Sequence, residues 1–244
     1  MDSLLRTKMI YGAEAVEQFG QKTVAVFGVG GVGSFVVEAL SRSGIGRLIL
    51  VDGDVIAESN LNRQLPATRD TIGRPKVEVM KERILSIQPA CQVEIHHALF
   101  RDPEQTPDLL FKDIDYLVDA IDDLSAKTEL LVWAHQNQIP VISSMGAGNK
   151  IDPTRFQVAD ISKTHTCALA RTLRRFLRSR GIYKGITTVF SSEIPRKPVL
   201  SAEPGTAKKA PPGSVCHVPA VAGLICASVV VNTLMDGESE AHVD

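Results

Sequence analysis

"VAVFGVGGVGSFVVEALSRSGIGRLILVDGDVIAESNLNRQ", from Val24 to Gln64, is the stretch that decides the fold. It holds an apolar run, a glycine-rich loop, an amphipathic segment and a second apolar run, in that order. This order is typical of a strand, a tight turn, a helix and a parallel strand. The stretch therefore predicts one βαβ unit of a Rossmann-like sheet.

The same alternation continues beyond this unit. The runs ILVD and YLVDA are apolar nearly throughout, as expected of strands covered on both faces. The sequence predicts an α/β, doubly wound, mostly parallel sheet over residues 1–160, and an α+β extension over residues 161–244 that completes the same domain. In that extension we expect a basic helix, a mobile Pro-, Gly- and Lys-rich loop from Ser192 to Ser214, and an apolar helix from Val218 to Leu234.

Bulk composition narrows the class of protein. The chain has 244 residues, 44% of them hydrophobic and 23% charged. Its formal net charge is −1, so the overall charge does not indicate a nucleic-acid-binding protein. The four cysteines form no CxxC pair, which argues against a zinc knuckle and a disulfide framework. The charged N-terminal segment resembles no signal peptide, and the apolar helix is short for a membrane span. We expect a cytoplasmic protein with no membrane partner, whose apolar helix is buried in the core.

The glycine loop predicts a phosphate site. Gly28, Gly30 and Gly33 match GxGxxG between a strand and a helix. Backbone N–H groups and the positive end of the helix dipole favour phosphate there. Asp52, at the end of the next strand, can accept hydrogen bonds from ribose hydroxyls. On these features alone, NAD is the first candidate ligand.

The residues after the second strand point to a different chemistry. They include Asp54, Asn60, Arg63 and Gln64, followed by Lys76. Hydride transfer has no need of two cations near the phosphates, whereas attack on an α-phosphate does, because negative charge builds up on the phosphorus and on the departing pyrophosphate. The pattern favours a nucleotide that is cleaved over one that is only held.

Two acidic residues, Asp122 and Asp123, follow the strand YLVDA at the carboxyl edge of the predicted sheet. A carboxylate at this edge can hold Mg²⁺ between phosphate oxygens. Asp123 fits the alternative role of a helix N-cap, because LSAKTELL follows it. The predicted metal residue is therefore Asp122.

Taken together, these motifs resemble the adenylating domain of ubiquitin-activating-type enzymes. The resemblance rests on GVGGVG at 28–33, which includes Gly31, on VDGD at 51–54, on SNLNRQ at 59–64 and on Gly73 to Lys76. It implies that ATP and Mg²⁺ are the cofactors and that Asp122 holds the metal. It further implies that Asp52 binds the ribose and that the phosphates are engaged by Asp54, Asn60, Arg63 and Lys76. Arg6 resembles the arginine that this family contributes across a homodimer interface, so Arg63, Lys76, Asp122 and Arg6 are the predicted catalytic residues.

Within this superfamily the chain resembles most closely the branch that acts on a modified adenosine of tRNA. The supporting stretches are SSMGAGNKIDPTRFQVADISKT at 143–164 and VPAVAGL at 218–224. The resemblance implies an ATP-dependent ligase that converts a carboxylate to an acyl-adenylate and promotes its cyclisation with loss of water. The alternative is adenylation of the C-terminus of a ubiquitin-like sulfur carrier, and a third reading is a nucleotide-sensing module without turnover.

The segment from Lys163 to Lys184 carries no acidic side chain. At helical spacing Arg171, Arg174, Arg175 and Arg178 share one face, while Leu169, Leu173, Phe176 and Leu177 are available to pack inward. A cationic stripe of this kind predicts contact with a tRNA backbone, although a solvated helix face or a sulfur-trafficking protein partner would also fit. Arg196, Lys197, Lys208 and Lys209 in the following loop could close over bound RNA. For Cys167, at the start of this helix, packing is favoured over a nucleophilic role.

Overall fold

The computed structural model describes residues 2–197, 199 and 212–235. Its centre is a seven-stranded sheet in the order β3-β2-β1-β4-β5-β7-β6. All neighbouring strands are parallel except β6, which pairs antiparallel with β7. The strands are β1 (Thr23–Phe27), β2 (Arg47–Val51), β3 (Gln92–His96), β4 (Tyr116–Asp119), β5 (Val141–Ser144), β6 (Phe156–Asp160) and β7 (Thr187–Ser191). The predicted doubly wound α/β class is confirmed.

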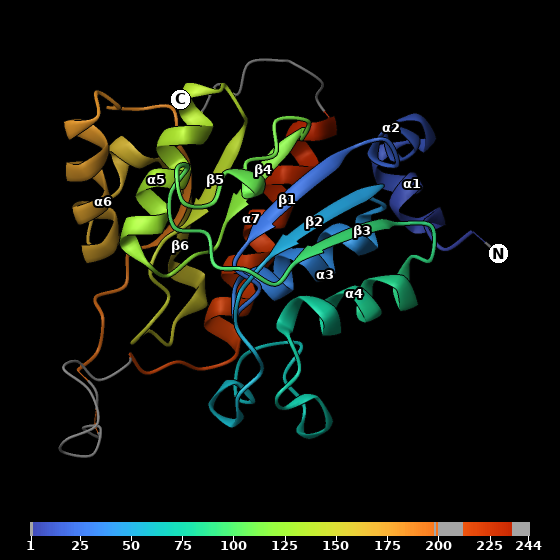
Figure 1. The fold of residues 1–244 in the computed structure, drawn as a ribbon, viewed down its shortest axis with the longest axis horizontal. Coiled ribbons are helices and arrows are strands. Elements are labelled where there is room, and N and C mark those ends of the chain that lie inside the picture. The colour runs from blue at the N-terminus through green and yellow to red at the C-terminus, as the bar shows by residue number, and fades with distance from the viewer. Residues whose placement is uncertain (1, 198, 200–211, 236–244) are drawn as a thin grey trace.

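Helices cover both faces of this sheet (Figure 1). The short helices α1 (Leu5–Tyr11) and α2 (Ala13–Phe19) precede β1. The longer ones are α3 (Gly33–Ser43), α4 (Lys76–Ile87), α5 (Leu124–Gln136), α6 (Ala168–Ser179) and α7 (His217–Met235). Helices α3, α4 and α7 pack on one face, and α5 and α6 on the other.

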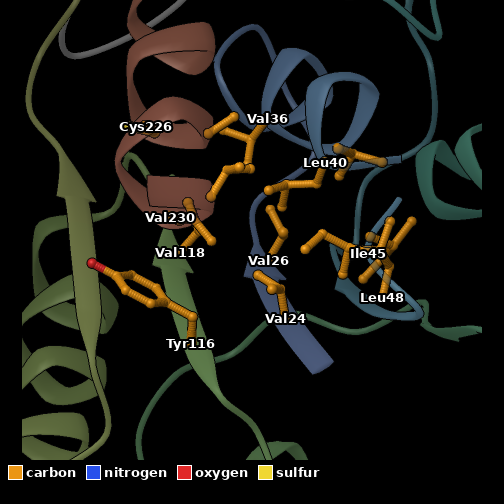
Figure 2. Close-up of a cluster of buried hydrophobic side chains, with 14 of the residues drawn as sticks. Val24, Val26, Val36, Leu40, Ile45, Leu48, Tyr116, Val118, Cys226 and Val230 are labelled. Carbon is orange, nitrogen blue, oxygen red and sulfur yellow. The ribbon is translucent and has the colours of Figure 1, made fainter. Parts of the chain in front are cut away.

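The alternation of side chains along each strand divides the core in two. In β1, Val24 and Val26 face α3 and α7, while Ala25 and Phe27 face the side of α5 and α6. Figure 2 shows the first of these clusters, where Val118 of β4 and Val230 of α7 lie beside Val26. All the side chains of β4 are buried, as the apolar run YLVD predicts for a strand covered on both faces.

Helix α7 belongs to the core. It makes its most extensive contacts with α3, and its side chains Cys226, Val230 and Leu234 are buried against the sheet. Within the described ranges α7 is the one helix whose length and composition would suit a membrane span. More than half of its apolar window is nevertheless buried inside the protein, as predicted for a core helix.

The segment after residue 160 joins the same sheet, because β7 lies between β5 and β6. Strand β6 lies at the edge of the sheet, and the predicted basic helix starts at Ala168, after a short 3₁₀ turn at Ile161–Lys163. Much of the loop expected from Ser192 to Ser214 lies outside the described residues, including Lys208 and Lys209.

Candidate nucleotide-binding and catalytic site

A cavity of about 550 Å³ lies at the carboxyl ends of β1, β2, β4 and β5. Open α/β sheets bind their ligands at this edge, next to the strand where the chain order reverses. Ten predicted site residues line it: Gly28, Gly30, Gly31, Asp52, Asp54, Asn60, Arg63, Gln64, Lys76 and Asp122. Residues far apart in the sequence are thus brought into one pocket.

The glycine loop makes a tight turn between the end of β1 and the start of α3. Gly28 has φ +86°, and a Cβ there would lie 2.7 Å from the carbonyl oxygen of Ala120. A Cβ on Gly33 would lie only 1.8 Å from the carbonyl oxygen of Gly28. Gly33 does not line the cavity, whereas Gly30 and Gly31 do. Because Gly33 has no side chain, α3 can approach the end of β1 closely.

Asp52 organises the end of β2. Its carboxylate accepts hydrogen bonds from the backbone N–H of Val29, at 2.6 Å, and of Asp54, at 2.8 Å. The Lys76 ammonium lies 2.6 Å from an Asp54 oxygen and 4.0 Å from an Asp52 oxygen. Asp52 thus ties the glycine loop to the next strand, and a buried cation faces the space between them.

The SNLNRQ segment forms the neighbouring wall, in the 3₁₀ turn Glu58–Asn60 and the residues after it. Arg63 donates from Nη1 to the Ser59 carbonyl at 2.7 Å and to the Asn62 side chain at 2.9 Å, and it has no carboxylate partner among the described residues. The Asn60 side chain accepts from the Ala57 N–H at 3.0 Å, which stabilises the turn. The buried Oε1 of Gln64 has no hydrogen-bond partner. The guanidinium charge of Arg63 is therefore available to an anionic ligand.

The two acidic residues after β4 have separate positions. Asp123 caps α5 by accepting from the Ala126 N–H at 2.8 Å, as the sequence suggested. Asp122 lines the cavity with an exposed side chain. The described residues contain no group of three or more candidate metal ligands. A single carboxylate such as Asp122 can contribute to a Mg²⁺ shell that phosphate oxygens and water complete.

Sequence reasoning missed a buried ion pair directly beneath the site. Lys127 of α5 and Asp119 at the end of β4 are fully buried, with Nζ and Oδ2 2.6 Å apart. Lys127 also donates to Ser143 and Ser144 of β5, and Asp119 accepts from the N–H of Ile121 at 3.1 Å. The pair therefore holds the carboxyl ends of β4 and β5 together at the edge of the cavity.

A second missed feature is the wall that follows β5. Residues 144–148 line the cavity, and the carbonyl oxygen of Gly146 accepts from the Lys150 ammonium at 2.9 Å. Lys150 is only 3% exposed. Burial lowers its pKa, while nearby Cys167 and Glu193 act in the opposite direction. A glycine pair following a strand at the carboxyl edge, as in MGAG, is the signal that could have pointed here.

The remaining predicted residues lie outside the cavity. Arg6 is exposed on α1 and does not line this cavity. On α6, Arg171, Arg175 and Arg178 are exposed, whereas Arg174 donates to the Thr164 carbonyl at 2.7 Å.

The inward face of α6 needs one correction. Leu173 and Leu177 are buried as expected, but the prediction that Phe176 packs inward is wrong. Its side chain is 39% exposed and lies beneath the guanidinium of Arg175. Cys167 is 5% exposed and belongs to the core cluster of α5 and α6.

Comparison with known proteins places this geometry in a family. The model of the ThiF family matches residues 2–242, almost the entire chain. The chain belongs to the ThiF family. A relative in Bacillus subtilis, tRNA threonylcarbamoyladenosine dehydratase, is 47% identical over 94% of this chain and 93% of its own.

The Escherichia coli protein of the same name is 40% identical over 77% of this chain and 72% of its own. Its crystal structure in complex with ATP has a TM-score of 0.84 at 35% identity, covering 95% of this chain and 93% of that one. A complex of the same protein with AMP gives a TM-score of 0.85. The resemblance to an adenylating superfamily, first seen in the glycine loop and the SNLNRQ segment, is confirmed.

Proposed function

We propose that this protein is an ATP-dependent tRNA threonylcarbamoyladenosine dehydratase, which adenylates the carboxylate of the modified nucleoside and promotes its cyclisation. The observation that carries the proposal is the convergence of Arg63, Lys76 and Asp122 on one cavity behind a glycine loop. The relative of the same name at 47% identity, and the crystal complexes of such an enzyme with ATP and AMP, support it.

The order of the strands arranges the substrates along the cavity. Asp52 follows β2, the glycine loop follows β1, Asp122 follows β4 and the Gly146 wall follows β5, in the spatial order of the sheet. The ribose lies at Asp52, and the phosphates lie against the N–H groups of the glycine loop at the start of α3. The acceptor carboxylate approaches from the side of β4 and β5.

In the first step a carboxylate oxygen attacks the α-phosphorus of ATP. The bond from that phosphorus to the oxygen bridging to the β-phosphorus breaks, and pyrophosphate leaves with the bonding electrons. Arg63 and Lys76 stabilise the negative charge that builds on the phosphoryl oxygens, because both cations are held in place before the reaction. Lys76 shares its ammonium between Asp54 and the phosphates.

In the second step the neighbouring carbamoyl group bonds to the activated acyl carbon. The bond from this carbon to the AMP oxygen breaks, AMP leaves with the electron pair, and the carbamoyl proton passes to water. Because both reacting groups belong to one nucleoside, ring closure is intramolecular and needs no enzyme thiol. The buried Cys167 accordingly keeps its packing role.

Asp122 would hold Mg²⁺ together with phosphate oxygens, and the metal would supply additional charge neutralisation at the triphosphate. The exposed cations Arg171, Arg175 and Arg178 on α6 would contact the tRNA backbone, with Arg174 held at the edge of that face by Thr164. Arg6 would act in the cavity of a second copy, which makes the active form a homodimer.

The decisive experiment incubates protein, ATP and tRNA carrying threonylcarbamoyladenosine, and analyses the nucleosides by mass. We expect a product lighter by one water, with AMP and pyrophosphate released in equal amounts. Arg63→Ala and Lys76→Ala should each lower kcat/KM by about 10²-fold or more, since each removes charge stabilisation of the transition state. Full activity in either variant would refute the assigned catalytic roles.

The competing function is adenylation of a sulfur-carrier protein by the same first step. It predicts that a protein ending in Gly-Gly stimulates pyrophosphate exchange and that modified tRNA does not. A nucleotide-sensing module would instead bind NAD tightly and release no AMP in any substrate mixture. The same assays therefore separate all three functions.

A further inference from the structure

The wall formed by residues 144–148 has no role in the adenylation step described above, yet it lines the same cavity. It follows β5, which neighbours β4, so it lies beyond Asp122 when counted from the glycine loop. That is the side on which the acyl group of the substrate must lie after adenylation. The wall consists largely of backbone, because Gly146, Ala147 and Gly148 offer at most a methyl group.

Lys150 fixes the orientation of one peptide in this wall. Its ammonium binds the Gly146 carbonyl oxygen from inside the protein, at 2.9 Å, and is itself only 3% exposed. The peptide bonds of the described chain are all trans, so the N–H of Ala147 points opposite to that carbonyl. Ala147 lines the cavity and Lys150 does not, so a carbonyl directed at the ammonium is consistent with an Ala147 N–H on the cavity side.

The hydrogen bonds around the wall leave this donor available. Met145 N–H donates to the Val189 carbonyl and Asn149 N–H to the Gly213 carbonyl, so both flanking residues are anchored. Among the described residues, no acceptor is found for the N–H groups of Gly146, Ala147 and Gly148. Gln64, on the same cavity, likewise has a buried amide oxygen without a partner. The pocket thus presents polar groups that a bound ligand can pair.

We infer that the Ala147 N–H is an oxyanion donor for ring closure, and that Lys150 is the positioning residue that aims it; this rests on the proposed function. When the carbamoyl group bonds to the acyl carbon, the carbonyl oxygen of the acyl-adenylate gains negative charge. A fixed N–H at this oxygen stabilises that charge more than it stabilises the uncharged adenylate, so it lowers the barrier. When AMP leaves, the electron pair returns to the carbonyl and the donor is released for the next turnover.

Local packing leaves space at Gly146, whereas a Cβ at Gly148 would lie 2.7 Å from the Pro212 side chain. A Cβ added at Gly146 would come no closer than 3.8 Å to Leu169 and 4.0 Å to the sulfur of Cys167. The protein itself therefore does not require glycine there, in contrast to Gly28. Glu193, 8% exposed, holds the chain beyond Lys150 by accepting from the N–H groups of Ile151 and Asp152.

The direct test replaces the peptide N–H of Ala147 by an ester oxygen, using lactic acid at this position. The change removes the donor while keeping the chain geometry. In single-turnover reactions with tRNA carrying threonylcarbamoyladenosine, we expect ring closure to slow by about 10²-fold, the usual effect of one oxyanion donor, while ATP binding stays unchanged. The matched control places an ester at Ile151, whose N–H bonds to Glu193 away from the cavity, and should leave ring closure unchanged.

Lys150→Met and Lys150→Arg provide a second, independent test. The first removes the donor to the Gly146 carbonyl and should lower kcat for ring closure by about 10-fold or more with little change in the KM for ATP; the second keeps a donor and should restore much of the rate. If the ester at 147 and Lys150→Met both close the ring at the wild-type rate, the inference is overturned. The proposed function would then still stand, provided that the wild type forms the cyclised product and that Arg63→Ala and Lys76→Ala remain strongly impaired.

Discussion

Two buried lysines, Lys76 and Lys127, have similar positions in their helices and similar ion-pair distances. They differ in how exposed the partner carboxylate is. Each lies in the first turns of a helix that follows a strand, and each has a carboxylate oxygen 2.6 Å from Nζ. The partner of Lys76 is Asp54, whose side chain is 60% exposed. The partner of Lys127 is Asp119, which is fully buried.

The difference lies in what else each ammonium can reach. Lys127 is surrounded by acceptors from β4 and β5, so all its charge is neutralised inside the protein. Lys76 faces a cavity, and its exposed partner can rotate into water when an anion arrives. A buried lysine is available for catalysis when its counterion is not buried with it.

The largest expected effect comes from Lys127→Met. It leaves the Asp119 carboxylate buried without its counterion, so we expect a loss of about 3–5 kcal/mol in the free energy of unfolding. Urea denaturation followed by circular dichroism would measure it. Adding Asp119→Asn to Lys127→Met should recover part of the loss, because the orphaned charge is removed; no recovery would show that the penalty has another source.

The pH dependence of stability tests the burial of a third lysine, Lys150. Burial lowers its pKa in the folded state below the ordinary value of 10.5. The unfolded chain therefore holds this proton more tightly, and the free energy of unfolding should rise with pH between the lowered pKa and 10.5. Lys150→Met should show a flatter profile across that window, measured by denaturation at several pH values. Parallel profiles would contradict the predicted direction.

For Lys76→Met we expect a small change in stability, about 1 kcal/mol or less, together with the loss of activity. Asp54 stays hydrated, and Asp52 keeps its two backbone N–H bonds at 2.6 and 2.8 Å. The comparison with Lys127→Met uses the same substitution and the same denaturation assay. A loss as large as that of Lys127→Met would break the proposed contrast between the two lysines.

The smallest effect belongs to a surface pair. Lys22 and Asp115 are 3.0 Å apart with side chains 34% and 32% exposed. Water screens such a pair, so Lys22→Met should change the free energy of unfolding by less than about 1 kcal/mol, with a further decrease of the pair's contribution in high salt. A value near that of Lys127→Met would show that exposure does not rank these pairs.

The parts of the site that could be predicted are those built by side chains within continuous motifs. The glycine loop, Asp52, Arg63 and Lys76 all lie between residues 28 and 76, and their spacing alone indicated a phosphate site. Asp119 and Lys127 escaped notice because burial decides their role, and burial depends on the packing of α5 against β5. The Gly146 wall escaped because it acts through backbone. Phe176 was misplaced because helical periodicity gives a face but not its width.

Pro219, in the first turn of α7, lies against the glycine loop at the other end of the chain. A Cβ on Gly31 would be 3.3 Å from the Pro219 side chain, and both residues line the cavity. Because a residue of α7 completes the wall that the glycine loop begins, the pocket reaches its final shape only when both segments are packed together.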